Sequence, residues 1–399
     1  MSAELPATPA QAKWLSEVQP LPVLILSSVA LLIIGVVMIS SASMDIAAAT
    51  MDNSYHYVIR QLVFAVLGCV LALVAVNVPI AWWERSGWLL LGVGLLVLVL
   101  VLTPLGRTVN GSTRWIPFGL FNVQVSEVAK LCLIAYLAGY VVRRRDELLN
   151  TWAGFLKPLA VLGVASALLV IQPDFGATVV LVTAAAGMIF LSGVRLSRFV
   201  PLIGILVGLG AVLIVTQPYR LKRVVSYLDP WKDQFDTGYQ LTQSLIAFGR
   251  GEWSGVGLGN SIQKLFFLPE AHTDFIFAII AEEFGLLGSL FVLGLFTVLV
   301  VTGFVIARRA EKADMPFAAC FSYGITLLIG LQAGINMAVS TGLLPTKGLT
   351  LPLVSYGGSS LLVSCVLIGI LARVEMEKLD KEKQVAEQTG SRRKRRGAV

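Results

Sequence analysis

The chain has 399 residues, of which 56% are hydrophobic and 14% are charged, and its mean hydropathy is +0.80. Soluble domains carry about 25% charged residues, so this composition excludes a soluble globular protein. The formal net charge of +7 does not indicate a nucleic-acid partner, because most Lys and Arg residues lie in short loops between apolar runs, where membrane proteins carry them.

Ten apolar runs follow one another along the chain. Most have about 18–22 residues, the length that a helix needs to cross a bilayer. They lack the period-two alternation of barrel strands, which excludes a β-barrel. We therefore predict an all-α, polytopic membrane protein with about ten transmembrane helices. The predicted spans are 21–40, 58–77, 86–103, 123–142, 154–172, 174–192, 199–216, 285–307, 316–337 and 353–372.

Basic residues cluster in the short loops after the fourth, sixth and eighth runs, at 143–145, 195–198 and 308–312. In the predicted order of spans, these three loops lie on the same side of the membrane. The positive-inside rule identifies that side as the cytoplasm. Both chain termini are then expected to be cytoplasmic as well.

The predicted domain organisation has three parts. Residues 1–20 form a polar cytoplasmic tail, residues 21–373 form the transmembrane domain, and residues 374–399 form a basic cytoplasmic tail. Two longer loops face outward, at about 104–122 and, before the eighth span, at about 217–272. Long loops cross membranes largely regardless of their charge, so the cations in the second loop do not contradict this topology.

The stretch from Pro269 to Gly285, directly after the longer outer loop, is the first candidate for a functional site. Glu270 and Asp274 are four residues apart, so they would share one face of a helix. Titratable groups at a membrane boundary are costly in free energy, which makes them functional candidates. The alternative is that Thr273 or Asp274 only caps a helix N-terminus.

Other ionisable residues fall in the same outer half of the predicted membrane domain. Glu127 and Lys130 are three apart and can pair on one helix face, where an ion pair could equally serve only to lock helices together. Asp174 lies in a turn with Pro and Gly, for which a structural role is expected. Lys347 lies in a helix-breaking segment and either lines a cavity or snorkels outward. The Gly-rich run 249–260 could form a phosphate-binding nest or a plain flexible loop.

Four motifs are long and specific, at 269–285, 238–244 (GYQLTQS), 344–352 (LPTKGLTLP) and 355–360 (SYGGSS). On these motifs the chain resembles the SEDS family, whose name stands for shape, elongation, division and sporulation. The resemblance covers essentially all of the predicted spans. The run 345–352 looks like the cell-division branch of that family, and the elongation (RodA-type) branch is the alternative within it.

The resemblance implies a peptidoglycan glycosyltransferase that polymerises lipid II at the outer face of the cytoplasmic (inner) membrane during septal cell-wall synthesis. Its active site would face the periplasm. The implied partners are lipid II, a class B penicillin-binding transpeptidase of the FtsI type and other divisome membrane proteins. The family's essential acid falls on Asp274, and its characteristic lysines match Lys130 and Lys347. Some division members have a basic residue where this chain has Asn122, so no role is transferred there.

The implied reaction suggests roles for these residues. A sugar hydroxyl is a weak nucleophile, so its attack needs a general base, for which Asp274 is the candidate. The leaving undecaprenyl pyrophosphate develops negative charge, which Lys130, Lys347 and Arg114 would stabilise. No resident metal is expected, although a divalent cation (Mg or Mn) could assist at the pyrophosphate. Further substrate-binding candidates are Glu127, His272, Gln240, Gln243, Ser355, Gly357 and Gly358.

Two other functions compete with this one. A lipid II flippase would need a polar path through the inner leaflet, but the inner halves of the predicted spans contain almost no ionisable residues. A purely non-catalytic divisome scaffold for the transpeptidase would give no reason for so many charges in the outer half. A scaffold role could still accompany catalysis.

Overall fold

The computed structural model describes residues 19–51, 53–109, 111–119, 121–216, 227, 229–232, 234–236, 238–346 and 348–396. Its elements in chain order are α2 (Pro20–Met51), α3 (His56–Asn77), α4 (Ile80–Arg85), α5 (Gly87–Leu100), β1 (Arg107–Val109), β2 (Ser112–Phe118), β3 (Phe121–Gln124), α6 (Val125–Arg143), α7 (Arg145–Asn150), α8 (Trp152–Ile171), α9 (Phe175–Leu191), the 3₁₀ helix η1 (Leu196–Arg198), α10 (Phe199–Val215), α12 (Tyr239–Gly251), the π-helix η2 (Gln263–Phe267), α13 (Ile276–Lys312), α14 (Pro316–Ser340) and α15 (Gly358–Arg396).

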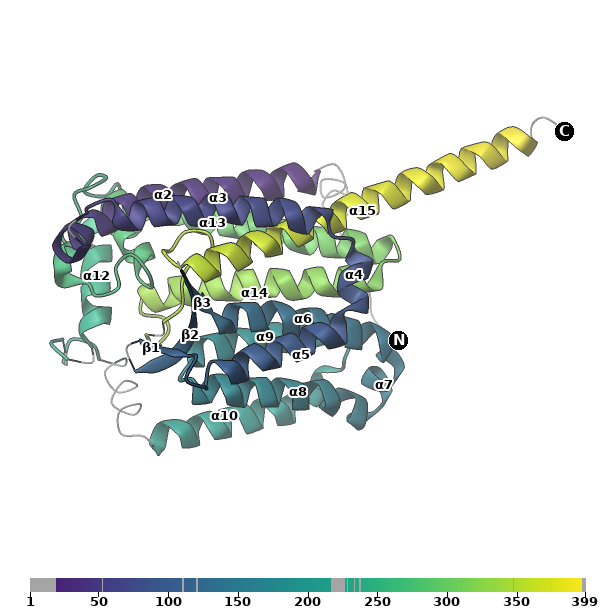
Figure 1. Cartoon of the computed structure of the whole chain (residues 1–399), viewed down its shortest axis with the longest axis horizontal. Coiled ribbons are helices and arrows are strands. Elements are labelled where there is room, and N and C mark those ends of the chain that lie inside the picture. Colours follow the sequence, from purple (N-terminus) through teal and green to yellow (C-terminus); the bar gives the residue numbers. More distant parts are fainter. Residues whose placement is uncertain are drawn as a thin grey trace.

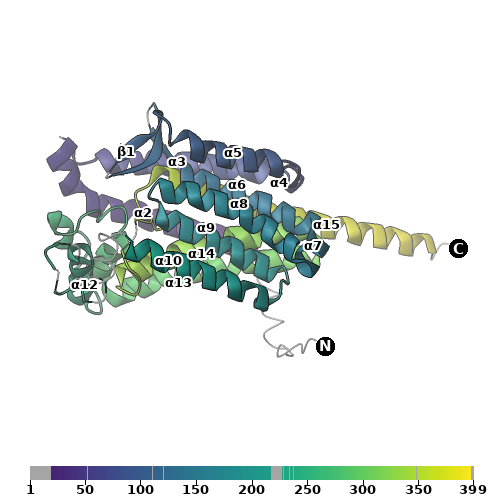
Figure 2. The same ribbon diagram turned by 90° about the horizontal axis from the view of Figure 1, so that it is seen from below.

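The long helices run side by side and form one elongated bundle (Figure 1). Seen after a turn of 90°, the same helices form stacked layers (Figure 2). Among the described residues, seven helices are long and apolar enough to cross a membrane, and shorter apolar helices accompany them. Helices suit a bilayer because each satisfies its backbone hydrogen bonds internally. The prediction of an all-α polytopic membrane protein is confirmed, while the number of spans and their orientation stay predictions.

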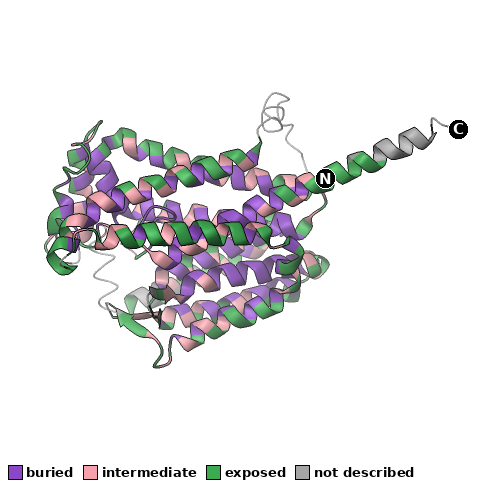
Figure 3. Ribbon diagram, turned by 45° about the horizontal axis from the view of Figure 1, so that its top comes forward, coloured by how far each residue is buried: buried purple, intermediate pink, exposed green. Residues whose placement is uncertain are grey.

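Burial separates a central helix from peripheral ones. In α6, 89% of the most apolar window is buried, against 39% in α2 and 17% in α3. Buried residues gather where the helices face one another, and exposed residues lie on the outer faces (Figure 3). The exposed aliphatic side chains of the peripheral helices suit a lipid environment, because lipid tails are as apolar as leucine. Helices α5, α9, α14 and α15 pack against α6, whereas α2 and α3 pack mainly against each other, α13 and α15.

Helices α3 and α15 pack closely because small residues lie between them. A Cβ on Gly68 would lie 2.7 Å from Cys365 Sγ, and a Cβ on Gly369 would lie 2.5 Å from the carbonyl oxygen of Ala72. Real Cβ atoms do not come this close to their neighbours, so position 369 requires glycine because it meets backbone, while a side chain at 68 would displace that of Cys365. Glycine thus allows the two backbones to approach, as it does in other membrane helix pairs.

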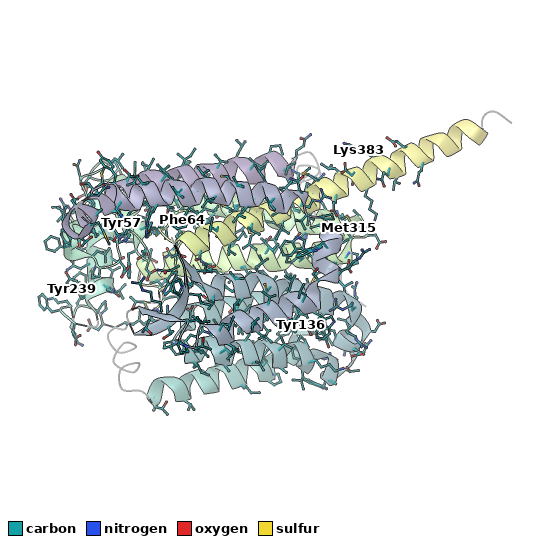
Figure 4. The ribbon with its side chains drawn as sticks, in the orientation of Figure 1. Tyr57, Phe64, Tyr136, Tyr239, Met315 and Lys383 are labelled. Atoms are coloured by element: carbon teal, nitrogen blue, oxygen red, sulfur yellow. The ribbon has the colours of Figure 1, made fainter. Side chains whose placement is uncertain are left out.

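Helix α15 continues without a break beyond the bundle as far as Arg396 (Figure 1). Lys383 marks this projecting part in Figure 4. The basic tail predicted from residue 374 onward is therefore helical over its described length. Residues 374–389 favour a helix because they contain strong helix formers and no proline.

A small antiparallel sheet forms where the sequence analysis predicts only an outer loop. Its strand order is β1-β2-β3, and Trp115 of β2 is paired with Gln124 of β3. Residues 112–118 contain several β-branched and aromatic residues, and the turn before them includes Gly111 with a φ of +74°. The sheet lies at the same end of the bundle as α12, which is called the sheet end below (Figure 1).

The longer predicted loop, 217–272, also contains a helix. Helix α12 packs against α13 and α14, and its Tyr239 lies at the sheet end, as does Tyr57 of α3 (Figure 4). The Ser244 hydroxyl donates a hydrogen bond to the carbonyl oxygen of Ser340 at 2.7 Å, which fastens α12 to the last turn of α14. Residues 217–226 of this loop lie outside the described part of the chain.

Helix α13 is interrupted at Gly285, which has a φ of +66° and a ψ of −161°. The backbone N–H groups of residues 256–257 donate to the carbonyl oxygens of residues 282–283. The N–H groups of residues 286–287 donate in turn to the carbonyl oxygens of residues 252–253, and these four bonds are 2.9–3.2 Å long. The Gly-rich run thus supplies hydrogen bonds that the broken helix cannot make for itself.

The run 249–260 is therefore a backbone partner of α13, and both earlier interpretations of it, a phosphate nest and a flexible loop, are wrong. A Cβ on Gly285 would lie 2.5 Å from the Gly255 nitrogen. A Cβ on Gly255 would collide with the carbonyl group of Glu283. The sequence is rich in glycine here because two backbones meet at closer range than side chains allow.

Two neighbouring acids of α13, both fully buried, bond residues 262–264, which directly follow the Gly-rich run. Glu282 accepts a hydrogen bond from the Ile262 N–H at 3.0 Å. Glu283 accepts from Lys264 Nζ at 3.0 Å and from Ser41 Oγ of α2 at 2.6 Å. Buried carboxylates persist only when they are paired and hydrogen-bonded. These contacts therefore tie the segment to α13 and α2.

We predict that Gly285→Ala lowers the stability of the protein. The backbone conformation at Gly285 is one that only glycine adopts readily, and forcing another residue into it costs about 1–3 kcal/mol. Gly294→Ala is the matched control, because a Cβ there would meet no atom within 4 Å and Ala favours a helix by about 0.5–1 kcal/mol. Thermal unfolding of both variants in detergent is the measurement. Equal unfolding midpoints would contradict the interpretation of the break.

Candidate active site

Asp274 lies in a tight turn directly before α13. The backbone N–H groups of residues 273–275 all lie 3.1–3.2 Å from the carbonyl oxygen of Glu270. Glu270 itself has a left-handed φ of +57°, so the helix can start only after the turn. It starts at Ile276, earlier than the predicted eighth span at 285.

The predicted helical arrangement of this turn is wrong in two respects. Glu270 and Asp274 do not share a helix face, because neither belongs to a helix. Neither Thr273 nor Asp274 caps α13, since the N-cap residue is Phe275 and no side chain makes a cap hydrogen bond. The Thr273 hydroxyl instead donates to Glu270 Oε2 at 2.7 Å. The capping function that would have explained Asp274 as a structural residue is thus absent.

The carboxylate of Asp274 lies where four separate parts of the chain meet. Arg114 comes from β2, Asp174 from the turn before α9, and Gly348 from the segment that joins α14 to α15. A Cβ on Gly348 would lie 3.2 Å from Asp274 Oδ2 and 3.8 Å from Arg114 Nη1. The Arg114 guanidinium lies 3.8 Å from Asp174 Oδ1. One cation and two acids therefore share this small region at the sheet end.

The surroundings of Asp274 favour its protonated form. Burial, which is the largest cause, and the negative charges of Glu270 and Asp174 together raise the pKa of Asp274 to about 7, against the opposing influence of Arg114. Burial also lowers the pKa of His272, against the influence of Glu270. A carboxyl group that titrates near neutral pH can accept a proton from a substrate and release it again, which is the property required of a general base.

Arg114 and Asp174 are held in place by contacts of their own. Arg114 donates to Ser112 Oγ at 3.1 Å and to the Pro173 carbonyl oxygen. Asp174 caps α9 by accepting a hydrogen bond from the Ala177 N–H at 3.2 Å, which confirms its predicted role as a structural turn residue. Its other oxygen, Oδ2, is buried without a hydrogen-bond partner among the described residues. Asp174 therefore also brings a negative charge to the site, which the sequence analysis did not predict.

Lys130 and Glu127 form the predicted ion pair, with 2.9 Å between Nζ and Oε1. Both side chains are almost completely buried. The Lys130 ammonium also donates to Gln332 Oε1 at 2.6 Å. The Gln332 amide in turn donates to the Thr350 carbonyl oxygen at 3.2 Å and to Ser360 Oγ at 3.3 Å. In this arrangement Lys130 faces protein groups, and its contact with substrate stays a prediction.

Asn336 lies one helical turn beyond Gln332 on α14 and is also buried. Its side-chain amide donates to the carbonyl oxygen of Asp274 at 2.8 Å and to that of Leu349 at 2.6 Å. The sequence analysis missed Gln332 and Asn336. The available signal was two amide side chains four residues apart in an otherwise apolar run, where buried polar groups need partners.

His272 belongs to a group of aromatic rings beside the Asp274 turn. Its ring centroid lies 4.9 Å from that of Tyr57 and 5.7 Å from that of Tyr356. The Tyr356 N–H donates to the His272 carbonyl oxygen at 3.0 Å, and the Tyr356 ring centroid lies 5.1 Å from that of Tyr57. The group joins α3 to the turn that carries Asp274. A contact of His272 with sugar or peptide stays a prediction.

The predicted substrate-binding residues of the 355–360 motif have packing contacts in the structure. Ser355 Oγ accepts a hydrogen bond from the Leu351 N–H at 2.8 Å and so closes a turn. A Cβ on Gly357 would lie 3.1 Å from Thr350, and a Cβ on Gly358 would lie 2.7 Å from the ring of Phe64. These contacts explain the residue types without a ligand, and the substrate roles stay predictions.

Three further candidates are not placed against Asp274. Gln240 and Gln243 lie half-buried on α12, which packs against α13 and α14. Lys347 lies outside the described residues. In the described part of the chain, no group of three or more His, Cys, Asp or Glu side chains could hold a metal ion. The substrate roles of these residues and the divalent cation at the pyrophosphate stay predictions.

Known proteins resemble this chain over almost its whole length. A model of the cell cycle protein family FTSW_RODA_SPOVE matches residues 22–380. A protein of Marinobacter nauticus named "Probable peptidoglycan glycosyltransferase FtsW" is 83% identical over 378 residues, with 95% of each chain covered. A protein of Hahella chejuensis with the same name is 58% identical, with 89% of this chain and 90% of the relative covered.

Two solved structures have a similar fold. One comes from work titled "Structural coordination of polymerization and crosslinking by a peptidoglycan synthase complex". It matches with a TM-score of 0.71 and 28% identity over 89% of this chain and 97% of the other. The rod shape determining protein RodA of Thermus thermophilus matches with a TM-score of 0.66 and 25% identity over 89% and 96%.

We predict that removing one partner of the buried Lys130–Glu127 pair is more harmful than removing both. Lys130→Met leaves the Glu127 carboxylate buried without its cation, which costs about 3–5 kcal/mol for a buried pair. Glu127→Gln combined with Lys130→Met leaves no charge and should be milder. The unfolding midpoints of Lys130→Met, of Glu127→Gln alone and of the double variant, measured in detergent, test this. A double variant that is less stable than Lys130→Met would contradict this interpretation.

Proposed function

Because this chain belongs to the FtsW/RodA/SpoVE family of cell cycle proteins, we propose that it is a peptidoglycan glycosyltransferase that polymerises lipid II. The names of the two relatives support this activity and favour the division branch over the elongation branch. The observation that carries the proposal is Asp274, a carboxyl group with a pKa raised to about 7 that lies beside an arginine at the sheet end.

The proposed reaction is a direct displacement. The 4-hydroxyl group of a lipid II sugar attacks the anomeric carbon of the growing glycan, and Asp274 takes the hydroxyl proton. A new C–O bond forms as the bond to the pyrophosphate breaks, and undecaprenyl pyrophosphate leaves with its electron pair. The α-linked donor gives a β-linked polymer, so the configuration inverts without a covalent sugar intermediate.

The leaving pyrophosphate needs positive charge nearby. Arg114 suits this role because its side chain is 22% exposed, while Ser112 and the Pro173 carbonyl hold its guanidinium in place. Lys347, which precedes Gly348 in the sequence, is proposed as a second cation. Lys130 is proposed to act in the same site together with Glu127.

The proposed setting is the septum, with the site facing the periplasm and with an FtsI-type class B transpeptidase as partner. The solved peptidoglycan synthase complex, whose title names polymerization and crosslinking together, supports a coupled transpeptidase. Other divisome membrane proteins are proposed as further partners.

The test of the proposed activity is to give lipid II to the purified protein with its transpeptidase. Glycan chains support the enzyme, and movement of lipid II across vesicles without polymer would support a flippase instead.

We predict that Asp274→Asn lowers polymerisation about 10²–10⁴-fold, the usual contribution of a general base. Asparagine keeps the size of the side chain but cannot accept the proton. Asp314→Asn is the matched control, because Asp314 is exposed and lies in the turn between α13 and α14, outside the site. Glycan synthesis is compared at equal amounts of folded, transpeptidase-bound protein. Near-normal synthesis by Asp274→Asn would sink the assignment.

The pH dependence follows from the raised pKa of Asp274, which is about 7. A general base works only when it is deprotonated, so the rate should rise with pH up to about 7 and level off above it. The midpoint of this rise should lie at about pH 7, and one pH unit below it the rate should be about tenfold lower than on the plateau. Initial polymerisation rates between pH 5 and pH 9 are the measurement. A profile that is flat over this range, as a group with the usual aspartate pKa near 4 would give, would argue against a buried base.

A further inference from the structure

Asn336 joins two parts of the chain that have no regular structure of their own. Its amide nitrogen donates to the carbonyl oxygen of Asp274 at 2.8 Å and to that of Leu349 at 2.6 Å. One carbonyl belongs to the turn before α13, and the other belongs to the segment between α14 and α15. A side-chain NH₂ group has two hydrogens, so it can serve both acceptors at once. The distance between the two segments is thereby fixed at their backbones.

We propose that Asn336 is a positioning residue that holds the Asp274 turn against the Gly348 segment and so sets where the catalytic carboxylate lies. This inference rests on the proposed function of Asp274. The clearance that Asn336 would control is small, since a Cβ on Gly348 would lie 3.2 Å from Asp274 Oδ2. A small movement of either segment would therefore change the environment of the carboxylate.

The remaining contacts of Asn336 agree with this role. Its Oδ1 atom is buried without a hydrogen-bond partner among the described residues, which is unfavourable for a polar atom. The residue is thus explained by its donor group alone. The neighbouring polar residues on the same face of α14 do not bond the Asn336 amide. Gln332 bonds Lys130, the Ser340 carbonyl accepts from Ser244 of α12, and the Ser340 hydroxyl donates to the backbone carbonyl oxygen of Asn336 at 3.0 Å, within the helix.

Two variants test the proposal. Asn336→Leu keeps a similar volume without donors, and Asn336→Asp keeps the shape but presents oxygen atoms to both carbonyl groups. For each we expect kcat to fall about 10²-fold, because small displacements of a catalytic group have effects of that size. KM should change less than about twofold, because Asn336 does not contact substrate. Ser340→Ala, one turn further along α14 and also buried, is the control and should keep both constants.

The pH profile separates positioning from a merely structural role. Among the described residues, the charged groups that act on the Asp274 carboxyl are Glu270, Asp174 and Arg114. A loosened turn admits water to the carboxyl group, so its pKa should fall toward the usual range and the acid limb of the rate profile should move to lower pH. A structural role would reduce the amount of folded protein and leave the midpoint unchanged.

Hydrogen–deuterium exchange tests the clamp without any activity. Backbone exchange at 272–276 and 349–351 should be faster in Asn336→Leu than in wild type, and unchanged in Ser340→Ala. Unchanged exchange, or wild-type kcat and midpoint per folded molecule, would overturn the proposal. So would a failure of both Asn336 variants to fold, since it would assign the residue a structural role. If wild type makes no polymer, the proposed function fails, while the exchange result still decides whether the clamp exists.

Discussion

A backbone polar group that is withdrawn from water must find another hydrogen-bond partner, and the sheet end of this protein depends on how that requirement is met. The break at Gly285 frees carbonyl and N–H groups of α13, and residues 252–257 bond them. The carbonyl groups of Asp274 and Leu349 also belong to segments without regular structure, and the Asn336 amide donates a hydrogen bond to each of them. Irregular backbone is thus kept at this depth by partners from other parts of the chain.

The same exclusion of water gives the site its chemistry. Burial raises the pKa of Asp274 to about 7, and a carboxyl group in water would titrate several units lower. Arg114 and Asp174 add opposite influences, because the guanidinium stabilises the charged carboxylate and the second acid disfavours it. A site that combines an acid near neutrality with a partly exposed arginine can move a proton and also bind a phosphate group.

Helix α14 connects the two polar groups of the core. Gln332 bonds the Lys130 ammonium, and Asn336, one turn away, bonds the Asp274 turn. Both amides also reach the segment between α14 and α15, through Thr350 and Leu349. Gln332 and Asn336, both on α14, therefore link the buried Lys130–Glu127 pair to the Asp274 turn. This link is a physical reason to expect that the ion pair matters for the proposed reaction, although it faces protein groups.

The sequence by itself determined the helical membrane fold, the Lys130–Glu127 pair and the candidate acid Asp274, because apolar run length and three-residue spacing are local properties of a chain. It did not determine the strands at 107–124 or the break at Gly285, since each depends on a pairing partner. It also did not determine the start of α13, which follows from the left-handed conformation of Glu270. The meeting of Asp274 with residues 114, 174 and 348, and the clamp by Asn336, were decided only by tertiary structure. Contacts between residues tens of positions apart produce no regular spacing in the sequence by which they could be recognised.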